Sequence, residues 1–384
     1  MIMETELLIA HGNQCRTDRN PEGALAYYAQ ALTQDRRSAG AFNNYGNVLR
    51  ECGDPEGAIP FLQRAISLDP TNATANFNLA VAYLLSGNYE LGWRQYETRW
   101  NYEHLAGSLP DWPQPRWNGQ DLKDKTILVI AEQGHGDNIQ FVRFIGDLAD
   151  RGGRVVLNVN ASLEPLFRSL RSISQIVING TNLPEFDYWT PIMSIPGLIG
   201  CTLGNLSHVQ YYLDAEPTKI KFWQEQLGPK KRLRVGFCWS GRRDTWINLH
   251  KAMPFETMLE LIKRNPEYEW VNLQTDCTAE EESILLSAGV KAYPGTITSF
   301  ADTAGLLHHL DVVLSVDTAV AHLAGAMGRP VWVMLNQYGL DWRWLLDRDS
   351  SPWYSTARLF RQPKMDDWSS VTEKIHKYLG WYKI

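Results

Sequence analysis

The stretch from Asp317 to Pro330, DTAVAHLAGAMGRP, combines residue types that suit the binding of a phosphate. It lies between two apolar runs, 312–316 and 331–335, and this pattern predicts a strand, a helix and a second strand. The start of such a helix presents unpaired backbone N–H groups and the positive end of the helix dipole. Thr318 adds a hydroxyl there, and His322 adds a ring nitrogen one turn later. We expect an anionic ligand at this carboxyl edge of a parallel sheet; the alternatives are a helix cap for Asp317 and a packed ring for His322.

A second candidate is the loop EQGHGD at 132–137, which follows the apolar run 126–131. Gly134 and Gly136 stand at a strand-to-helix turn, where glycine lets the backbone approach a ligand closely. The loop has neither the third glycine of a dinucleotide fingerprint nor the lysine of a P-loop, so by itself it specifies no ligand. Asp137 is a residue type that caps helices, and His135 carries an imidazole that titrates near neutral pH.

Three further places supply polar groups that could face the same ligand. In WSGRR (239–243), which ends an apolar run, Ser240 and Gly241 could bind phosphate through a hydroxyl and a backbone N–H. Arg242 and its neighbour could clamp a diphosphate, or be only solvated. Gln274 ends the run VNLQ. Arg343, in DWRW (341–344), could reach a phosphate or a sugar hydroxyl, with tryptophans forming a wall.

The motif at 317–330 resembles the donor-site motif of the heptosyltransferase-like glycosyltransferases, family 9. Over roughly residues 5–380 the chain resembles the bacterial branch of that family in which tetratricopeptide repeats precede the transferase. The resemblance implies a two-lobed GT-B fold and an inverting transfer of sugar from a nucleotide-diphosphate sugar. It implies no cofactor besides that co-substrate and no metal. It also implies that Asp137 is the general base, with capping alone as the alternative role and His135 as the alternative base.

The segment TWINLHKAMP at 245–254 departs from the family, which shows Asn-Asp-x-x-Arg-Ser-Ile-Pro at this place. Asn248, Lys251 and Pro254 fit loosely, and Lys251 would offset charge on the leaving diphosphate. Because the Arg-Ser pair is replaced by Lys-Ala, the identity of the donor and the activity itself stay open. Asp347-Arg348-Asp349 matches the DxD pattern of metal-dependent sugar transferases, but the resemblance favours catalysis without a metal.

A 34-residue repeat occupies the N-terminal part of the chain. Small residues recur at Gly12, Gly46 and Ala80, and again at Ala24, Ala58 and Gly92. Small residues at a fixed phase let two helices cross closely, which is the tetratricopeptide pattern, and three such repeats are about the minimum for a stable stack.

Alternating apolar and helical segments after the repeats predict two α/β halves with parallel sheets. We expect strands at 126–131, 154–159, 174–178, 187–192, 234–239, 269–273, 311–316 and 330–335. The expected domains are repeats at 1–105, a Pro- and Trp-rich connector at 106–121, an N-terminal Rossmann-like lobe on the acceptor side at 122–215, a linker at 216–233, and a C-terminal Rossmann-like lobe on the donor side at 234–384.

The composition excludes several classes of function. Hydrophobic residues make up 44% and charged residues 21%, as in ordinary globular proteins, and the net charge of −6 argues against nucleic-acid binding. The five cysteines are far apart and favour free thiols in a reducing compartment. Neither a signal peptide nor an apolar run long enough to span a membrane is evident, so we expect a cytoplasmic location.

The sequence therefore predicts a glycosyltransferase whose repeats bind a protein or peptide acceptor or partner. Two alternatives remain. In one, the transferase lobes are inactive and the repeats serve as a scaffold for a partner protein. In the other, the enzyme is of the lipopolysaccharide heptosyltransferase type and acts on a saccharide, although such enzymes do not need repeats.

Overall fold

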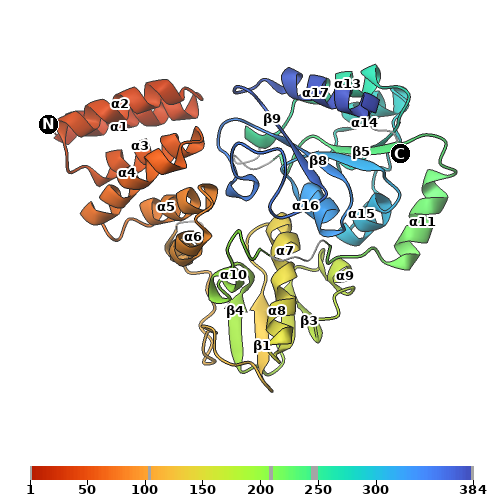
Figure 1. The fold of residues 1–384 in the computed structure, drawn as a ribbon, viewed down its shortest axis with the longest axis horizontal. Coiled ribbons are helices and arrows are strands. Elements are labelled where there is room, and N and C mark those ends of the chain that lie inside the picture. The colour runs from red at the N-terminus through yellow and green to blue at the C-terminus, as the bar shows by residue number, and fades with distance from the viewer. Residues whose placement is uncertain (1, 103–104, 207–210, 244–249, 382–384) are drawn as a thin grey trace. The chain divides into compact units, whose positions relative to one another are not determined.

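The computed structural model describes residues 2–102, 105–206, 211–243 and 250–381, and the chain divides into two compact units (Figure 1). The first unit comprises Met1–Trp112, Gly200–Leu206 and Gln337–Arg348. The second comprises Pro113–Ile199, Ser207–Asn336 and Asp349–Ile384. The predicted fold class, helical repeats followed by α/β domains with parallel sheets, is confirmed.

Helices of the first unit stack in sequence order, each against the next (Figure 1). They are α1 (Ile2–Thr17), α2 (Pro21–Gln34), α3 (Ala39–Glu51), α4 (Pro55–Leu68), α5 (Ala73–Leu85), α6 (Tyr89–Tyr96) and the 3-10 helix η1 (Glu97–Asn101). The second helix of each pair begins at a cap repeated every 34 residues, because Asn20, Asp54 and Asn88 each accept a hydrogen bond from the backbone N–H three residues on.

Glycines at the repeat phase allow the helices to cross closely, as predicted. A Cβ atom on Gly12 would lie 2.4 Å from the ring of Tyr28, and one on Gly46 would lie 2.9 Å from Leu62. The alternation of small and large residues thus fixes the spacing between the helices of a pair.

The first unit also holds a segment that interrupts the second. Residues Gln337–Arg348, with the 3-10 helix η4 (Trp342–Trp344), pack against the repeats. Tyr338 donates a hydrogen bond of 2.7 Å to Glu51, and the backbone N–H of Gly339 donates to the carbonyl of Glu51 at 3.0 Å. The Trp342 ring lies edge-on to the Trp93 ring, with centroids 5.3 Å apart.

The second unit contains two parallel sheets. The first has the order β3-β2-β1-β4, with β1 (Thr126–Ile130), β2 (Arg154–Val159), β3 (Gln175–Ile178) and β4 (Tyr188–Pro191). The second has the order β6-β5-β7-β8-β9, with β5 (Arg234–Cys238), β6 (Glu269–Asn272), β7 (Val312–Val316), β8 (Val331–Leu335) and β9 (Ala357–Arg361). The predicted strands are all present, whereas β9 was not predicted.

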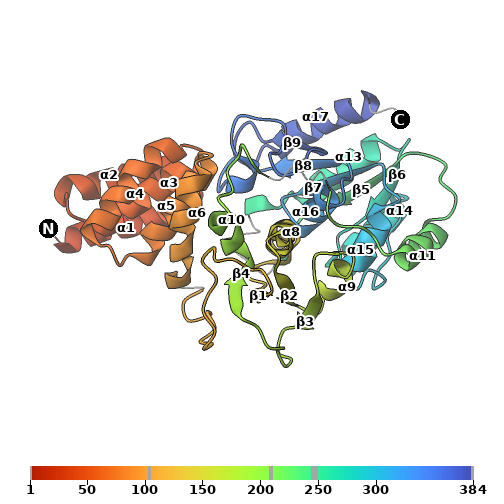
Figure 2. The same cartoon turned by 60° about the horizontal axis from the view of Figure 1, so that its bottom comes forward.

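Helices connect and cover these strands (Figures 1 and 2). With the first sheet are α7 (His135–Phe141), η2 (Val142–Phe144), α8 (Ile145–Asp150), α9 (Glu164–Phe167), η3 (Ile192–Ser194) and α10 (Ile195–Leu198). With the second are α13 (Phe255–Arg264), α14 (Ala279–Ser287), α15 (Phe300–Leu307), α16 (Ala319–Ala326) and α17 (Trp368–Trp381). Among the helices that the structure describes, none is long and apolar enough to cross a bilayer.

The segment predicted as a linker folds into a helix, α11 (Pro217–Leu227), which lies beside α15 (Figure 2). Trp223 on α11 is fully buried, and Lys219 forms an ion pair of 2.6 Å with Asp302 of α15. The linker is therefore a packed part of the second unit.

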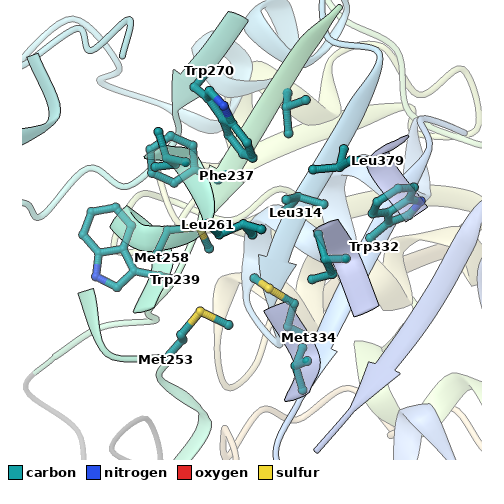
Figure 3. Packing of buried hydrophobic residues seen from close by; sticks show 14 of the residues in the cluster. Phe237, Trp239, Met253, Met258, Leu261, Trp270, Leu314, Trp332, Met334 and Leu379 are labelled. Atoms are coloured by element: carbon teal, nitrogen blue, oxygen red, sulfur yellow. The ribbon is translucent and has the colours of Figure 1, made fainter. Parts of the chain in front are cut away.

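One hydrophobic cluster holds the second sheet together (Figure 3). It joins side chains of β5–β8 to those of α13 and α17; Phe237, Trp270 and Leu314 are among its buried members. Each large apolar side chain buried in this way stabilises the fold by about 1.5–3 kcal/mol. The cluster gives a rigid base for the loops that leave the carboxyl ends of these strands.

Candidate functional site

The glycine loop after β1 is held in shape by its own side chains. Asp137 accepts a hydrogen bond of 2.8 Å from the backbone N–H of Gly134, which caps the start of α7. Asn138 is buried and bonds to both the backbone N–H and the carbonyl of Glu132, at 3.2 and 3.0 Å. The capping role that the sequence left open for Asp137 is thus observed.

Gly136 brings this loop against the start of α16. A Cβ atom on Gly136 would lie 3.0 Å from Cδ2 of His322 and 3.4 Å from Cα of Ala319. Helices α7 and α16 pack on each other, as Figure 1 also shows. Glycine is needed here for close backbone approach, and the result is that two predicted stretches meet.

His135 lies among groups from three elements. Its Nε2 atom is 2.9 Å from the hydroxyl of Ser162, and its ring lies 5.2 Å from that of Phe300. Burial lowers the pKa of His135 below its ordinary value, and the positive charge of Arg242 lowers it further. The imidazole is therefore held neutral at neutral pH, and the loop after β5 lies within electrostatic reach of it.

The loop after β5 is fixed by Gln274, from the end of β6. Oε1 of Gln274 accepts hydrogen bonds from the backbone N–H of Ser240 at 3.1 Å and from the thiol of Cys238 at 3.2 Å. Burial raises the pKa of the Cys238 thiol to about 12, so it stays protonated and serves as a donor. Ser240 itself donates to the carbonyl of Gly241 at 3.0 Å, whereas Arg242 is exposed.

The loop after β7 contains the start of α16 and an ion pair. Thr318 is the residue before α16; its side chain makes no cap, and its hydroxyl is 2.9 Å from that of Ser315. Asp317 is buried and forms an ion pair with Lys251 through Oδ2, while Nε2 of His322 lies 3.7 Å from its Oδ1. A partly buried lysine held by a carboxylate is a cation kept in one place.

Most of the predicted site residues are therefore brought together in the second unit. The contacts just described link Gly134, His135, Gly136, Asp137, Ser240, Gly241, Arg242, Lys251, Gln274, Asp317, Thr318 and His322. Arg343 is different, because it belongs to the first unit, where it pairs with Asp341 at 3.2 Å and lies over the Trp342 ring.

Part of the segment that departs from the family pattern, residues 245–249 with Asn248, lies outside the described residues. Within the described ranges, no group of three or more His, Cys, Asp or Glu side chains is arranged to hold a metal ion. The DxD stretch is divided, since Asp347 falls in the first unit and Asp349 in the second.

Sequence reasoning missed several residues that shape the site. Ser162 and Phe300 flank His135, and Tyr354 contacts His322. These residues stand in separate segments and follow no spacing that would connect them to the motifs. Only tertiary contacts identify them.

A cavity of about 810 Å³ opens at the opposite, amino-terminal edge of the second sheet. Its lining includes Arg234, Asp311 and Arg329. Asp311 pairs with Lys230 at 2.7 Å, and Arg329 donates to the carbonyls of His308 and Leu310. These charged groups are engaged in contacts that stabilise the fold, so we take the carboxyl edge of the sheet, and not this cavity, as the candidate site.

Comparison with known proteins supports the two-part architecture. The family described as TPR repeat matches residues 46–87. Protein FlbA of Caulobacter vibrioides is 26% identical over 331 residues, which cover 79% of this chain and 54% of FlbA. The chain thus spans about half the length of this curated relative.

Two solved structures resemble the part after the repeats. The glycosyl transferase family 9 protein of Veillonella parvula has a TM-score of 0.52 at 11% identity, over 69% of this chain and 99% of that chain. The ADP-heptose lps heptosyltransferase II of E. coli has a TM-score of 0.49 at 15% identity, over 67% and 98%. The chain therefore joins tetratricopeptide repeats to α/β domains with the fold of a family 9 glycosyl transferase structure.

Proposed function

We propose that the chain is an inverting glycosyltransferase of the GT-B type. It would transfer a sugar from a nucleotide-diphosphate sugar to a hydroxyl on an acceptor, without a metal. The observation that carries the proposal is the meeting of three strand-end loops from two parallel sheets. Gly136 packs against the start of α16, and Arg242 lies close enough to lower the pKa of His135. Ligands of open α/β sheets bind at such carboxyl edges.

The donor diphosphate would lie at the loops after β5 and β7. The backbone N–H groups at the start of α16, with Thr318, Ser240 and Gly241, are donors for phosphate oxygens. Arg242 and Lys251 supply positive charge that would stabilise the departing diphosphate. Gln274, Asp317 and His322 hold these groups in place; Arg343 remains a predicted donor contact that belongs to the first unit.

Asp137 would act as the general base. The acceptor oxygen attacks the anomeric carbon and a new C–O bond forms, while the bond from that carbon to the diphosphate oxygen breaks. The electron pair leaves with the nucleoside diphosphate, and the hydroxyl proton passes to the Asp137 carboxylate. His135 is the second candidate base, because its lowered pKa leaves the ring neutral and able to accept a proton.

The repeats would bind the acceptor, a protein or peptide, or a partner that presents it. Stacked helical repeats form extended surfaces that bind polypeptides, which supports this assignment.

Replacing Asp137 by Asn tests the base. The amide keeps an oxygen that can accept the N–H of Gly134, so the cap of α7 remains, but it cannot take a proton. We expect transfer to fall by about 100-fold or more, with unchanged nucleotide affinity, in a mass-spectrometric assay over a panel of nucleotide sugars.

Asp137→Ala, which removes the cap as well, and His135→Gln complete the comparison. Unchanged transfer by Asp137→Asn would show that the base lies elsewhere. If calorimetry with the wild-type protein detects no binding of any nucleotide or nucleotide sugar, the transferase proposal fails.

A further inference from the structure

An arginine with no carboxylate among its observed contacts lies buried in η2, directly after α7. Arg143 is 6% exposed, and its Nη2 donates to the carbonyl of Trp353 at 2.9 Å. In the described parts of the chain, its Nε and Nη1 atoms have no hydrogen-bond partner. Its guanidinium carbon instead lies 4.7 Å from the ring centroid of Tyr212, 5.4 Å from Trp353 and 5.2 Å from Tyr354.

Burying such a charge is costly, and three aromatic rings offset part of that cost. The contacts between the guanidinium and the three rings position the rings as well as the arginine. Tyr212 donates to the carbonyl of Ile139 at 2.9 Å, which closes the cage around the end of α7.

Tyr354 connects this cage to the candidate site. Its hydroxyl lies 2.9 Å from Nδ1 of His322. Its ring packs on α16, where a Cβ atom on Gly325 would lie only 2.4 Å from the Tyr354 ring. Both the position of the hydroxyl and that of the His322 ring are therefore fixed by packing.

The other nitrogen of the same imidazole faces a carboxylate. Nε2 of His322 lies 3.7 Å from Oδ1 of Asp317, and Oδ2 of Asp317 holds Lys251. A lone pair on Nε2 would be repelled by that carboxylate, whereas an N–H would be attracted. The hydrogen therefore belongs on Nε2, and Nδ1 must then accept a hydrogen bond from the phenol of Tyr354.

We propose that Arg143 and Tyr354 are positioning residues that fix the tautomer of His322 with its hydrogen on Nε2, directed toward Asp317. The guanidinium beside the Tyr354 ring makes the phenol a better donor. The His322 N–H in turn attracts Oδ1 of Asp317 across 3.7 Å, while Oδ2 of Asp317 forms the ion pair with Lys251. This chain of contacts from Arg143 to Lys251 does not depend on the proposed function. Its consequence, that Lys251 is positioned to neutralise a diphosphate, does rest on it.

Nitrogen NMR of the full-length protein labelled with ¹⁵N-histidine tests the tautomer directly. The His322 signals are identified by their loss in His322→Gln. We expect a protonated Nε2 and an unprotonated, hydrogen-bonded Nδ1 in the wild type. In Tyr354→Phe the ring against Gly325 is kept, and the Nδ1 signal should move toward that of a nitrogen without a hydrogen bond.

Arg143→Met should shift the same signal in the same direction, and Arg143→Lys, which keeps a cation, should shift it less. Tyr268→Phe is the matched control, because it removes another buried tyrosine hydroxyl of this lobe, one that donates to the carbonyl of Leu379. It should leave the His322 signals unchanged. A hydrogen on Nδ1 in the wild type, alone or together with Nε2, overturns the proposal, as does an unchanged signal in Tyr354→Phe.

The NMR measurement does not depend on catalysis. A result that contradicts the tautomer is therefore distinct from a result that contradicts the proposed function. If both hold, the affinity for a nucleoside diphosphate such as UDP or ADP, whichever binds, should fall about fivefold in Tyr354→Phe, as expected for the loss of one hydrogen bond.

Discussion

Single side chains at the site carry structural tasks beside their proposed chemical ones. Asp137 caps α7 through the Gly134 N–H, and Asp317 holds Lys251 in an ion pair. Truncation of such a side chain to alanine removes its structural contact together with its proposed chemical role. Substitutions that keep the hydrogen bond are therefore the informative ones, which is why Asn is the first choice at position 137.

Packing around His322 makes Gly325 intolerant of a larger side chain. A Cβ atom there would lie 2.4 Å from the Tyr354 ring, so Gly325→Ala must displace that ring or the helix. We expect the free energy of unfolding to fall by about 1–3 kcal/mol in denaturant titration. The control is Gly380→Ala on α17, which meets nothing within 4 Å and should leave stability equal or up to about 1 kcal/mol higher. Equal effects of the two changes would contradict the packing argument.

The lowered pKa of His135 predicts a pH dependence of stability. Burial and Arg242 favour the neutral ring in the folded protein, whereas the unfolded ring binds a proton below about pH 6.5. Below about pH 6.5 the unfolded state therefore binds more protons than the folded state. The free energy of unfolding is not reduced by His135 above about pH 6.5, and it decreases as the pH falls below that value.

His135→Gln should therefore make the free energy of unfolding less dependent on pH between about pH 7 and pH 5. Chemical denaturation at several pH values measures this. An unchanged pH dependence would show that His135 is not held neutral by its surroundings.

At the scale of elements, the segment Gln337–Arg348 depends on the repeats for its position. The Tyr338 hydroxyl donates to Glu51, a buried carboxylate that Arg16 also contacts. Tyr338→Phe removes one hydrogen bond to a charged group, worth about 1.5–3 kcal/mol.

We expect the backbone amides of 337–348 to exchange faster with solvent in Tyr338→Phe, as measured by hydrogen exchange and mass spectrometry. Tyr83→Phe is the control, because its hydroxyl bonds only to the exposed Gln63 in the described contacts. Equal exchange in the two variants would mean that the Glu51 contact does not hold the segment.

The elements also show where sequence patterns succeed and fail. The buried strands β5 (RVGFC), β7 (VVLSV) and β8 (VWVML) are mostly apolar, as expected for a parallel sheet that is covered on both faces. Strand β9, ARLFR, lies at the edge of the sheet with β8 as its one neighbour in the order, and its mixed residues give no such run. Helix α11 was not predicted for a similar reason. Its segment is mostly polar, and Trp223 and Leu227 are its buried residues.

On the scale of the whole molecule, the first unit is built from separate parts of the sequence, because Gln337–Arg348 belongs to it although the residues on both sides belong to the second unit. The side chains of Tyr338, Leu340, Trp342 and Trp344 are buried in the first unit, with exposed fractions of 4, 7, 4 and 1%. Removing residues 2–102 should uncover this apolar surface. We expect the truncated protein to aggregate and to bind a hydrophobic dye, as light scattering and fluorescence would show.

Replacing residues 337–348 by a Gly-Ser linker in the same truncated protein should restore solubility, because the apolar surface is then absent. A soluble, cooperatively unfolding protein without the repeats but with the segment would contradict this view of the first unit.

Local sequence patterns were enough to predict the repeats, the strands β1–β8 and the loops in which polar residues follow these strands. These depend on periodicity and on hydrogen bonds between near neighbours, such as the caps at Asn20, Asp54 and Asn88. Such interactions leave a pattern within a few residues.

Contacts between side chains that are distant in the sequence became visible in the folded structure alone. Tyr354 contacts His322 across 32 residues, and Tyr338 contacts Glu51 across 287. These pairings arise because the folded backbone brings the groups to one place, and no local spacing encodes them. Their energies depend on burial and on the partners present, so they are set by the packed fold as a whole.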